Sequence, residues 1–465
     1  MAGIVVALMQ TLVVPLIPEF PKLLSATAAD ATWAITATLL AGAVATPVVG
    51  RLGDMYGKRR MLLVSLVLMV SGSVVCALGD TLAPMVAGRA LQGLAAGVIP
   101  LGISIMRDEL PAEKLGSATA MMSASLGVGG ALGLPAAAFL AERADWHLLF
   151  WTAAGLGALV AVLVSVLVPE SSVRTGGRFD LVGGIGLSIA LICLLLAISK
   201  GADWGWTSTL TSSLFGVFAV TLVAWGWWEL RTERPLVDLR TTARRQVLLT
   251  NLASAVFGYA MFAMYLVLPQ LLQLPAVTGY GLGQTMLTVG LVLGPSGLVM
   301  MAMAPLSARI SRVQGPKTTL MCGAVVVAAG YGIGIVLMAE VWQLLLVSSV
   351  IGAGIGLAYG AMPALIMAAV PVSETAAANS LNTLMRSIGT SISSAVTGLI
   401  LAHLTISLGA ATVPSQNGFR IVLAIGSGAA LLALVIMAFL PKHTAHPAAA
   451  LPVATGPRVR EPAVD

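Results

Sequence analysis

Long apolar segments separated by short polar connections dominate the hydrophobic pattern of this chain. Each segment is about 20 residues long, the length at which an α-helix crosses the hydrocarbon core of a bilayer. Isolated strands would leave backbone groups unpaired in lipid, so we predict that every segment is a helix. The predicted membrane spans are residues 2–20, 31–49, 61–79, 83–105, 115–141, 147–168, 180–200, 210–229, 247–268, 284–304, 318–338, 341–367, 376–403 and 419–440. The pattern therefore predicts an all-α polytopic membrane protein with fourteen transmembrane helices.

A sequence repeat relates two of the polar connections. The run P-V-V-G-R-L-G-D-M-Y-G-K-R from Pro47 aligns with P-L-S-A-R-I-S-R-V-Q-G-P-K from Pro305. Parallel halves related by an axis along the membrane normal are a known plan for transporters. The repeat predicts two six-helix bundles joined by two intervening helices. The expected domains are 1–168, the linker helices within 169–246, 247–440, and a disordered cytosolic tail at 441–465 that is rich in Pro and Ala.

Composition and charge agree with this layout and exclude other classes of protein. Hydrophobic residues make up 58% of the 465 positions and charged residues 9%, which leaves too little polar surface for a soluble domain. The 25 Lys and Arg gather mostly in alternate connections and in the tail, so the positive-inside rule places these and both termini in the cytosol. The net charge of +6 thus reflects orientation in the inner (plasma) membrane and predicts no nucleic-acid partner. The first span begins directly at Met1 without a basic leader, so we predict no signal peptide and leave an upstream start open.

Cysteine and histidine positions predict no disulfide, metal, cofactor or enzyme chemistry. The three cysteines each lie inside an apolar segment, and no pair has the spacing of metal ligands. The four histidines stand at span ends or in the tail, with no carboxylate or cysteine partner in register. The chain also lacks a Walker A pattern, so ATP hydrolysis is not expected to drive it.

The polar connection from Gly50 to Arg60 carries the most specific motif, G-R-L-G-D-M-Y-G-K-R-R. It resembles the cytoplasmic signature loop between helices 2 and 3 of the major facilitator superfamily, G-x-L-x-D-R-x-G-R-K-x-x-L. The matching residues are Gly50, Leu52, Asp54, Gly57, Lys58 and Arg59. Met55 stands where the family usually has arginine. The resemblance implies a gating loop in which Asp54 joins a charge pair that holds one state closed.

A second motif places an arginine inside the fourth predicted span. The run M-V-A-G-R-A-L-Q-G-L-A-A-G resembles the family's l-x-x-x-R-x-x-q-G-x-g-a-a, with Arg89, Gln92 and Gly93 in register. A guanidinium at this depth costs about 2.5–3.5 kcal/mol on insertion scales, so it must face water or a partner. The resemblance implies that Arg89 and Gln92 take part in proton coupling. The alternative is a structural arginine bonded to carbonyls of a neighbouring helix.

Two further motifs of the family are degraded. The fifth span reads S-L-G-V-G-G-A-L-G-L-P-A-A and is only loosely similar to the antiporter motif g-x-x-x-G-P-x-x-G-G. Its candidate residues, which allow close helix packing or bending, are Gly127, Gly130, Gly133 and Pro135. In the first span the antiporter branch shows D-x-T-x-x-N-x-A-x-P, and Met9 occupies the acidic position here. No Asp or Glu lies at a predicted midplane, so Asp54 and Glu19 are the carboxylate candidates for proton coupling.

Polar and aromatic side chains in several spans are candidates for a substrate cavity. These residues are Gln10, Thr11, Tyr259, Tyr265, Asn379, Asn382 and Arg386. Asn382 and Arg386 are four residues apart and share a helix face, which either lines a cavity or holds helices together. Tyrosines near methionines suit a binding site for varied apolar solutes. The same residue types are also common at positions that face lipid or lie at the membrane interface.

Taken together, these motifs resemble the fourteen-helix drug:proton antiporter branch of the major facilitator superfamily over nearly the whole chain. The resemblance implies secondary active export of hydrophobic or cationic small molecules by alternating access. The expected partners are the lipid bilayer, a small-molecule substrate and protons, and we expect a monomer. The degraded motifs keep open an alternative, namely uptake or facilitated diffusion of a small metabolite by the same fold.

Overall fold

The computed structural model describes residues 2–11, 13, 16, 20–143, 145–171, 173–408 and 411–440, and most of them lie in helices. The principal helices are α1 (Ala2–Thr11), α4 (Trp33–Tyr56), α5 (Lys58–Leu78), α6 (Leu82–Gly93), α7 (Val98–Glu109), α8 (Ala112–Arg143), α9 (His147–Leu167), α10 (Leu181–Trp204), α11 (Thr209–Arg231), α13 (Arg245–Gln273), α14 (Met286–Gln314), α15 (Pro316–Val336), α16 (Val341–Ala369), α17 (Thr375–His403) and α18 (Gln416–Ala438). The short elements are α2 (Phe20–Leu23), α3 (Ala28–Ala31), η2 (Leu94–Gly97), α12 (Leu239–Thr242), η3 (Ala276–Thr278), η4 (Val372–Glu374), β1 (Thr405–Leu408) and β2 (Ala411–Pro414).

Thirteen helices in the described part of the chain are long and apolar enough to cross a membrane. They correspond to the second to fourteenth predicted spans, and α6, η2 and α7 together form one of them. The first predicted span begins with α1, and much of its second part lies outside the described residues, as do Glu19 and the predicted tail at 441–465. The prediction of an all-α polytopic membrane protein is confirmed.

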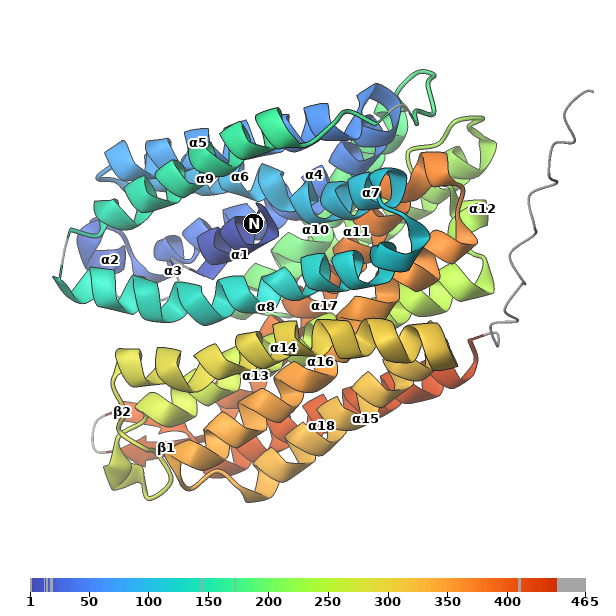
Figure 1. The fold of residues 1–465 in the computed structure, drawn as a ribbon. Coiled ribbons are helices and arrows are strands. Elements are labelled where there is room, and N and C mark those ends of the chain that lie inside the picture. The colour runs from blue at the N-terminus through green and yellow to red at the C-terminus, as the bar shows by residue number, and fades with distance from the viewer. Residues whose placement is uncertain are drawn as a thin grey trace, which may run out of the picture.

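Two helical bundles with separate hydrophobic cores make up most of the molecule (Figure 1). One core is built from α1 and α4 to α9, and the other from α13 to α18. Each core also takes residues from the opposite half: Ala376 of α17 packs in the first, and Ala120 and Ala124 of α8 pack in the second. The halves therefore meet through α17 and α8. We propose the predicted boundaries, 1–168, 169–246 and 247–440, as the domains.

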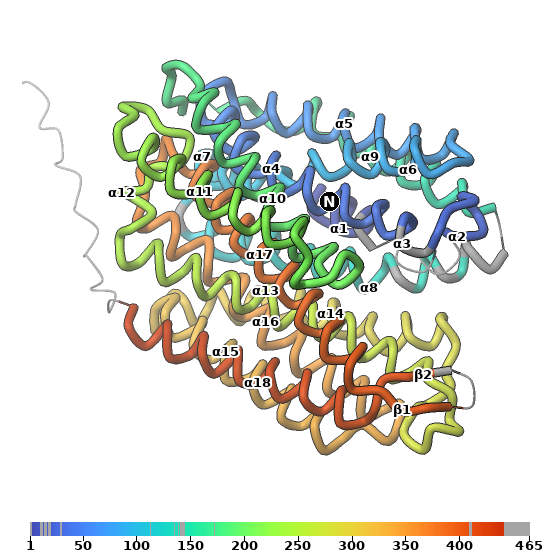
Figure 2. Tube along the Cα trace, turned by 180° about the vertical axis from the view of Figure 1, so that it is seen from behind, coloured from blue at the N-terminus to red at the C-terminus, as the bar shows by residue number. Residues whose placement is uncertain are grey.

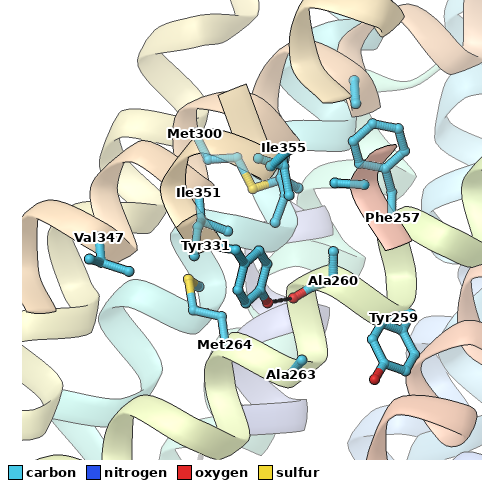
Figure 3. Packing of buried hydrophobic residues seen from close by; sticks show 14 of the residues in the cluster. Phe257, Tyr259, Ala260, Ala263, Met264, Met300, Tyr331, Val347, Ile351 and Ile355 are labelled. Atoms are coloured by element: carbon cyan, nitrogen blue, oxygen red, sulfur yellow. Dashed lines mark hydrogen bonds between the residues drawn. The ribbon is translucent and has the colours of Figure 1, made fainter. Parts of the chain in front are cut away.

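Close packing and hydrogen bonds hold the second bundle together around Tyr331 (Figure 3). This tyrosine of α15 is fully buried, and its hydroxyl donates a hydrogen bond to the carbonyl of Ala260 in α13. Met300 of α14 and Ile351 and Ile355 of α16 belong to the same cluster. Because lipid is as apolar as these side chains, such packing and interhelical hydrogen bonds, rather than removal from water, favour helix association.

The linker helix α10 lies against one of the two seams between the halves, and α11 packs against α10 (Figure 2). Leu187 and Leu191 of α10 pack with Ala43 of α4 and Leu384 of α17, so α10 touches both halves. The other seam is formed by α8 and α14, which pack along each other. The additional helices therefore make the two seams unequal.

The predicted polar loop from Gly50 to Arg60 is not a loop. Helix α4 continues to Tyr56 and α5 begins at Lys58, so Gly57 alone joins them. Asp54 and Lys58, the two fully buried charged side chains of this segment, have buried partners that are described below, so they do not need the solvent that a loop would give them. Gly57 has φ of +119°, and a Cβ there would lie 2.6 Å from Oε1 of Glu170, so only glycine fits.

The two ends of the molecule differ in structure. We call the end at which α4 joins α5 the motif face; α12 and the connection between α16 and α17 lie at the same end. The opposite end carries α2, α3 and the antiparallel hairpin of β1 and β2 (Figure 1). This hairpin is not predicted by the hydrophobic pattern, because its residues lie between two predicted spans.

Candidate functional site

Asp54 joins the two halves at the motif face. Its fully buried carboxylate accepts hydrogen bonds from the backbone N–H groups of Ala376 (3.2 Å) and Ala377 (2.8 Å). These groups lie in the first turn of α17, where a helix has no internal partners for its N–H groups. The helix dipole also favours a negative charge at this end. A side chain of the first half thus caps a helix of the second.

A buried ion network extends from Asp54 within the first half. The ammonium of Lys58 lies 2.6 Å from Oδ2 of Asp108 and 3.8 Å from Oδ1 of Asp54, and its side chain is fully buried. Ser171 donates a hydrogen bond of 2.6 Å to the same Oδ2 of Asp108. Arg51 and Arg107 also attract these carboxylates electrostatically, together with Lys58. The positive end of the α17 dipole adds to that attraction.

Arg107, at the end of α7, makes a second contact between the halves. Its guanidinium donates to the carbonyls of Met367 (2.8 Å), Val370 (3.2 Å) and Pro371 (3.4 Å) and to the hydroxyl of Thr375 (2.6 Å). The last carbonyls of a helix lack internal partners and favour a cation, so Arg107 complements the end of α16. In the sequence Arg107 is one of many cations at span ends, which the positive-inside rule predicts, so its contact with the second half is not visible there.

Replacing Arg107 with glutamine is expected to open the motif face. Hydrogen bonds to charged groups contribute about 1.5–3 kcal/mol each. Losing those that the Arg107 guanidinium donates should therefore raise the population of molecules with an open motif face by roughly tenfold or more. The measurement is the rate at which a water-soluble maleimide labels a cysteine at Ser380, which is buried on α17 beside Gly50. For this test the three native cysteines, Cys76, Cys193 and Cys322, are first replaced by serine, so that the introduced cysteine is the only thiol.

Lys114→Gln is the matched control for that experiment, because Lys114 is an exposed cation near the same face whose side chain forms no hydrogen bond or ion pair with a described residue of the second half. Its labelling rate should equal that of the parent protein. Equal rates for the parent and for Arg107→Gln would show that Arg107 does not hold the face closed.

The other residues of the first motif have distinct positions. Gly50 lets α4 approach α17 closely, since a Cβ there would lie 2.2 Å from Oγ of Ser380. Leu52 is half-buried on α4. Arg59 points toward the end of α9, where its backbone N–H donates to Glu170 and its guanidinium to the carbonyl of Ser165. The structure therefore brings Gly50 and Asp54 to α17, whereas Arg59 stays within the first half.

Arg89 and Gln92 form a buried polar network inside the first bundle. The guanidinium of Arg89, which is 3% exposed, donates to the carbonyls of Ala34 (3.1 Å) and Met9 (3.3 Å) and to Oε1 of Gln92 (2.7 Å). Gln92 in turn donates to Oγ of Ser73 at 2.9 Å. Among the described residues no carboxylate forms an ion pair with Arg89. This geometry matches the structural alternative given above, in which carbonyls of α1 and α4 hold the arginine.

The glycine-rich helix α8 forms the seam with α14. A Cβ at Gly297 would lie 2.0 Å from the carbonyl oxygen of Gly127, and one at Gly290 would lie 2.9 Å from the ring of Pro135. The candidates Gly130 and Gly133 are buried on the same helix, which runs through Pro135 without interruption. Small residues thus allow the two halves to approach closely along this seam.

The polar face of α17 holds helices of the second half together. The Asn382 amide donates to Oδ1 of Asn251 at 2.9 Å, and Ser254 donates to the Asn382 carbonyl at 3.0 Å, which ties α17 to α13. Asn379 donates within its own helix, to the carbonyl of Thr375. The guanidinium carbon of Arg386 lies 4.7 Å from the ring centroid of Tyr359, a cation–π contact with α16.

The remaining cavity candidates lie on α1 and α13. Figure 3 shows Tyr259 with its hydroxyl directed away from the cluster around Tyr331, and this hydroxyl has no hydrogen-bond partner among the described residues. Tyr265 is partly buried against the second core. Gln10 and Thr11 belong to α1, but their side chains lie outside what the structure describes. The structure therefore does not bring all of these candidates into one site.

Comparison with known proteins adds to this geometry. Residues 1–394 and 274–462 match the model of the Major Facilitator Superfamily. Multidrug resistance protein 3 of Bacillus subtilis is 26% identical over 377 residues, covering 79% of this chain and 72% of that protein. Multidrug resistance protein Stp of Mycobacterium tuberculosis is 27% identical over 373 residues, covering 80% and 68%. Multidrug export protein EmrB of Haemophilus influenzae is 30% identical over 297 residues, covering 63% and 57%.

A solved structure also shares the fold. The crystal structure of the human organic anion transporter MFSD10 (TETRAN) superposes with a TM-score of 0.64 at 15% identity, covering 94% of this chain and 97% of that one. This likeness concerns the fold alone. The match to the family model extends over both halves, including the Asp54 segment and α17. The chain therefore belongs to the Major Facilitator Superfamily of membrane transporters.

Proposed function

We propose that the protein exports hydrophobic or cationic small molecules across the plasma membrane, in exchange for protons and as a monomer. The observation that carries this proposal is the pair of contacts at the motif face, where Asp54 caps α17 and Arg107 caps the end of α16. The names of the multidrug resistance and export relatives support the substrate class. The positive-inside rule supports a cytosolic motif face and cytosolic termini.

Alternating access requires contacts that hold one face closed and break when it opens, and the contacts at the motif face would have this role. The hydrogen bonds that Ala376 and Ala377 donate to Asp54, and the one that Arg107 donates to Thr375, hold the motif face closed, and they must break when that face opens. A substrate shifts such an equilibrium only by the difference between its affinities for the two states. A substrate from the cytosol must therefore bind the open state more tightly by several kcal/mol to offset the broken contacts. For a complete switch, the ratio of its affinities for the open and closed states must be on the order of 10⁴.

Protonation of Asp54 supplies a route for coupling. The neutral carboxyl would lose its attraction for the positive end of α17 and for Lys58, and the closed state would weaken. A proton that reaches Asp54 would thus favour opening of the motif face, and its release to the cytosol would favour closing. Glu19 and the Arg89 and Gln92 pair remain the other candidates for this role.

One observation favours the second candidate function, uptake or facilitated diffusion of a small metabolite. Met9 stands at the position where the antiporter branch has an acid, and its backbone carbonyl, rather than a carboxylate, accepts a hydrogen bond from Arg89. A transporter without a carboxylate at this depth has fewer groups that can carry a proton through the membrane.

Transport by purified protein in proteoliposomes distinguishes the two functions. With an imposed pH gradient, acid on the side opposite the motif face, we expect a fluorescent organic cation to move from the motif face toward that side. Collapse of the gradient with an ionophore should abolish net movement. Net movement of the cation that does not depend on the pH gradient would contradict proton exchange and would favour facilitated diffusion.

A further inference from the structure

A cavity of about 460 Å³ lies at the motif face beside the contact between Asp54 and α17. Its wall is formed by α4, by residues 174–176 between α9 and α10, by residues 229–242 around α12, and by the first turns of α17. Ala377, whose N–H binds Asp54, is one of these wall residues. The cavity thus adjoins the closed contact and is built from both halves and from the connections of the linker helices.

Arg51 is a buried cation on this wall. It lies one turn after Pro47 on the same face of α4, and its side chain is 8% exposed. It makes no hydrogen bond to any described residue and no ion pair within 4 Å, and Asp54, three residues away, is occupied by α17 and Lys58. No nitrogen of Arg51 is among the fully buried polar atoms that lack a partner, so its guanidinium faces the cavity, where water or an anion can bind it.

A second unpaired donor lies on the same wall. The hydroxyl of Thr175 is buried and has no hydrogen-bond partner among the described residues. Its backbone N–H donates to the carbonyl of Asp54 at 2.8 Å, which fixes the connection between α9 and α10 beside Arg51. Arg174 and Arg234 also reach the wall from exposed positions and add positive charge.

Acidic side chains limit the charge that this cavity accepts. Glu229, Glu233, Asp238 and Glu374 line it together with the arginines. Asp238 is already used as the N-cap of α12, where it accepts hydrogen bonds from the N–H groups of Arg240 and Thr241. Since the wall is mixed in sign, it suits one small oxyanion at Arg51 better than a polyanion.

We propose that this cavity binds the phosphate group of an anion, through the guanidinium of Arg51 and the hydroxyl of Thr175. The planar guanidinium matches two phosphate oxygens at once, and a hydroxyl can donate to a third. The source of the phosphate is either a soluble cytosolic compound or the headgroup of an anionic phospholipid. Because the bound group would touch α4, the α9–α10 connection and the start of α17, it would stabilise the closed motif face.

The test uses the purified full-length protein and needs no transport assay, so its result does not depend on whether the proposed export function is correct. In nanodiscs of phosphatidylcholine, we expect inorganic phosphate to raise the unfolding temperature in a saturable way, compared with chloride at equal ionic strength. In nanodiscs with phosphatidylglycerol and no added phosphate, the same rise would identify the lipid as the source. A response to either probe supports the site.

Variants decide whether the response comes from this cavity. Arg51→Gln should shift the half-maximal phosphate concentration at least tenfold upward or remove the response to phosphatidylglycerol, and Thr175→Val should weaken it several-fold without changing charge. Arg309→Gln is the matched control, because Arg309 occupies the repeat-related position on α14, is exposed and does not line the cavity. A response unchanged in Arg51→Gln, or no response of the parent protein to either probe, would overturn the proposal.

Discussion

Replacing Asp54 with asparagine is expected to open the motif face and to raise labelling of a cysteine at Ser380 by on the order of 30–150-fold. The asparagine retains the shape of the side chain but loses its charge. Ala376 and Ala377 donate to different carboxylate oxygens, so in asparagine one of the two N–H groups faces the NH2 donor. Losing a charge-assisted hydrogen bond and the attraction to the helix dipole costs about 2–3 kcal/mol, which corresponds to that change in the open population.

The control for this variant is Glu109→Gln, which removes a carboxylate from the same face at an exposed position. Its labelling rate should match that of the parent. In proteoliposomes, Asp54→Asn should also lose transport that is driven by a pH gradient, since its side chain no longer binds and releases a proton. Slow labelling in Asp54→Asn would show that the contact with α17 does not hold the closed state.

Replacing Arg89 with alanine is expected to lower the free energy of unfolding by about 3–5 kcal/mol. The change leaves the carbonyls of Ala34 and Met9 and the amide of Gln92 without their donor in an apolar interior, and it removes a large buried side chain. The measurement is the midpoint of unfolding in detergent, followed by the loss of helical circular dichroism.

Arg89→Lys separates a structural role from a role in proton coupling. Lysine keeps the charge but cannot reach three acceptors with the same planar geometry, so part of the stability should return. If transport also returns in proportion to folded protein, the arginine is structural. If folded protein returns and transport driven by the pH gradient does not, Arg89 takes part in coupling. Unchanged stability in Arg89→Ala would contradict the network described above.

The sequence predicted the helices and the location of the motif well, because apolar length and cation position are local properties of the chain. It did not predict what Asp54 and Arg107 bind, since their partners are backbone groups more than 250 residues away along the chain. Because nearly every residue has the same backbone N–H and C=O groups, no sequence motif marks a contact that is made to them. Complementarity between a charge and a helix end emerges only when the two halves are placed together.

The same reason explains one wrong expectation and one question that the sequence left open. The Gly50 to Arg60 segment was expected to be a polar loop because its side chains are charged, yet partners supplied by Asp108 and α17 allow it to remain helical. The polar face of α17 was open to two interpretations, and Asn251 and Ser254, which tie Asn382 to α13, lie in a different predicted span. The polarity of a residue was visible in the sequence, but its neighbours were not.

The covering of one seam by α10 has a consequence for solutes that dissolve in the bilayer. For an apolar molecule that diffuses within one leaflet, Leu187 and Leu191 of α10 would block lateral access between α4 and α17. In the described part of the chain, neither linker helix packs over the seam between α8 and α14. The sideways entry of such a molecule into the protein would then be confined to one flank. The two linker helices would therefore make the two seams of a nearly symmetric transporter differ in their access to solutes from the bilayer.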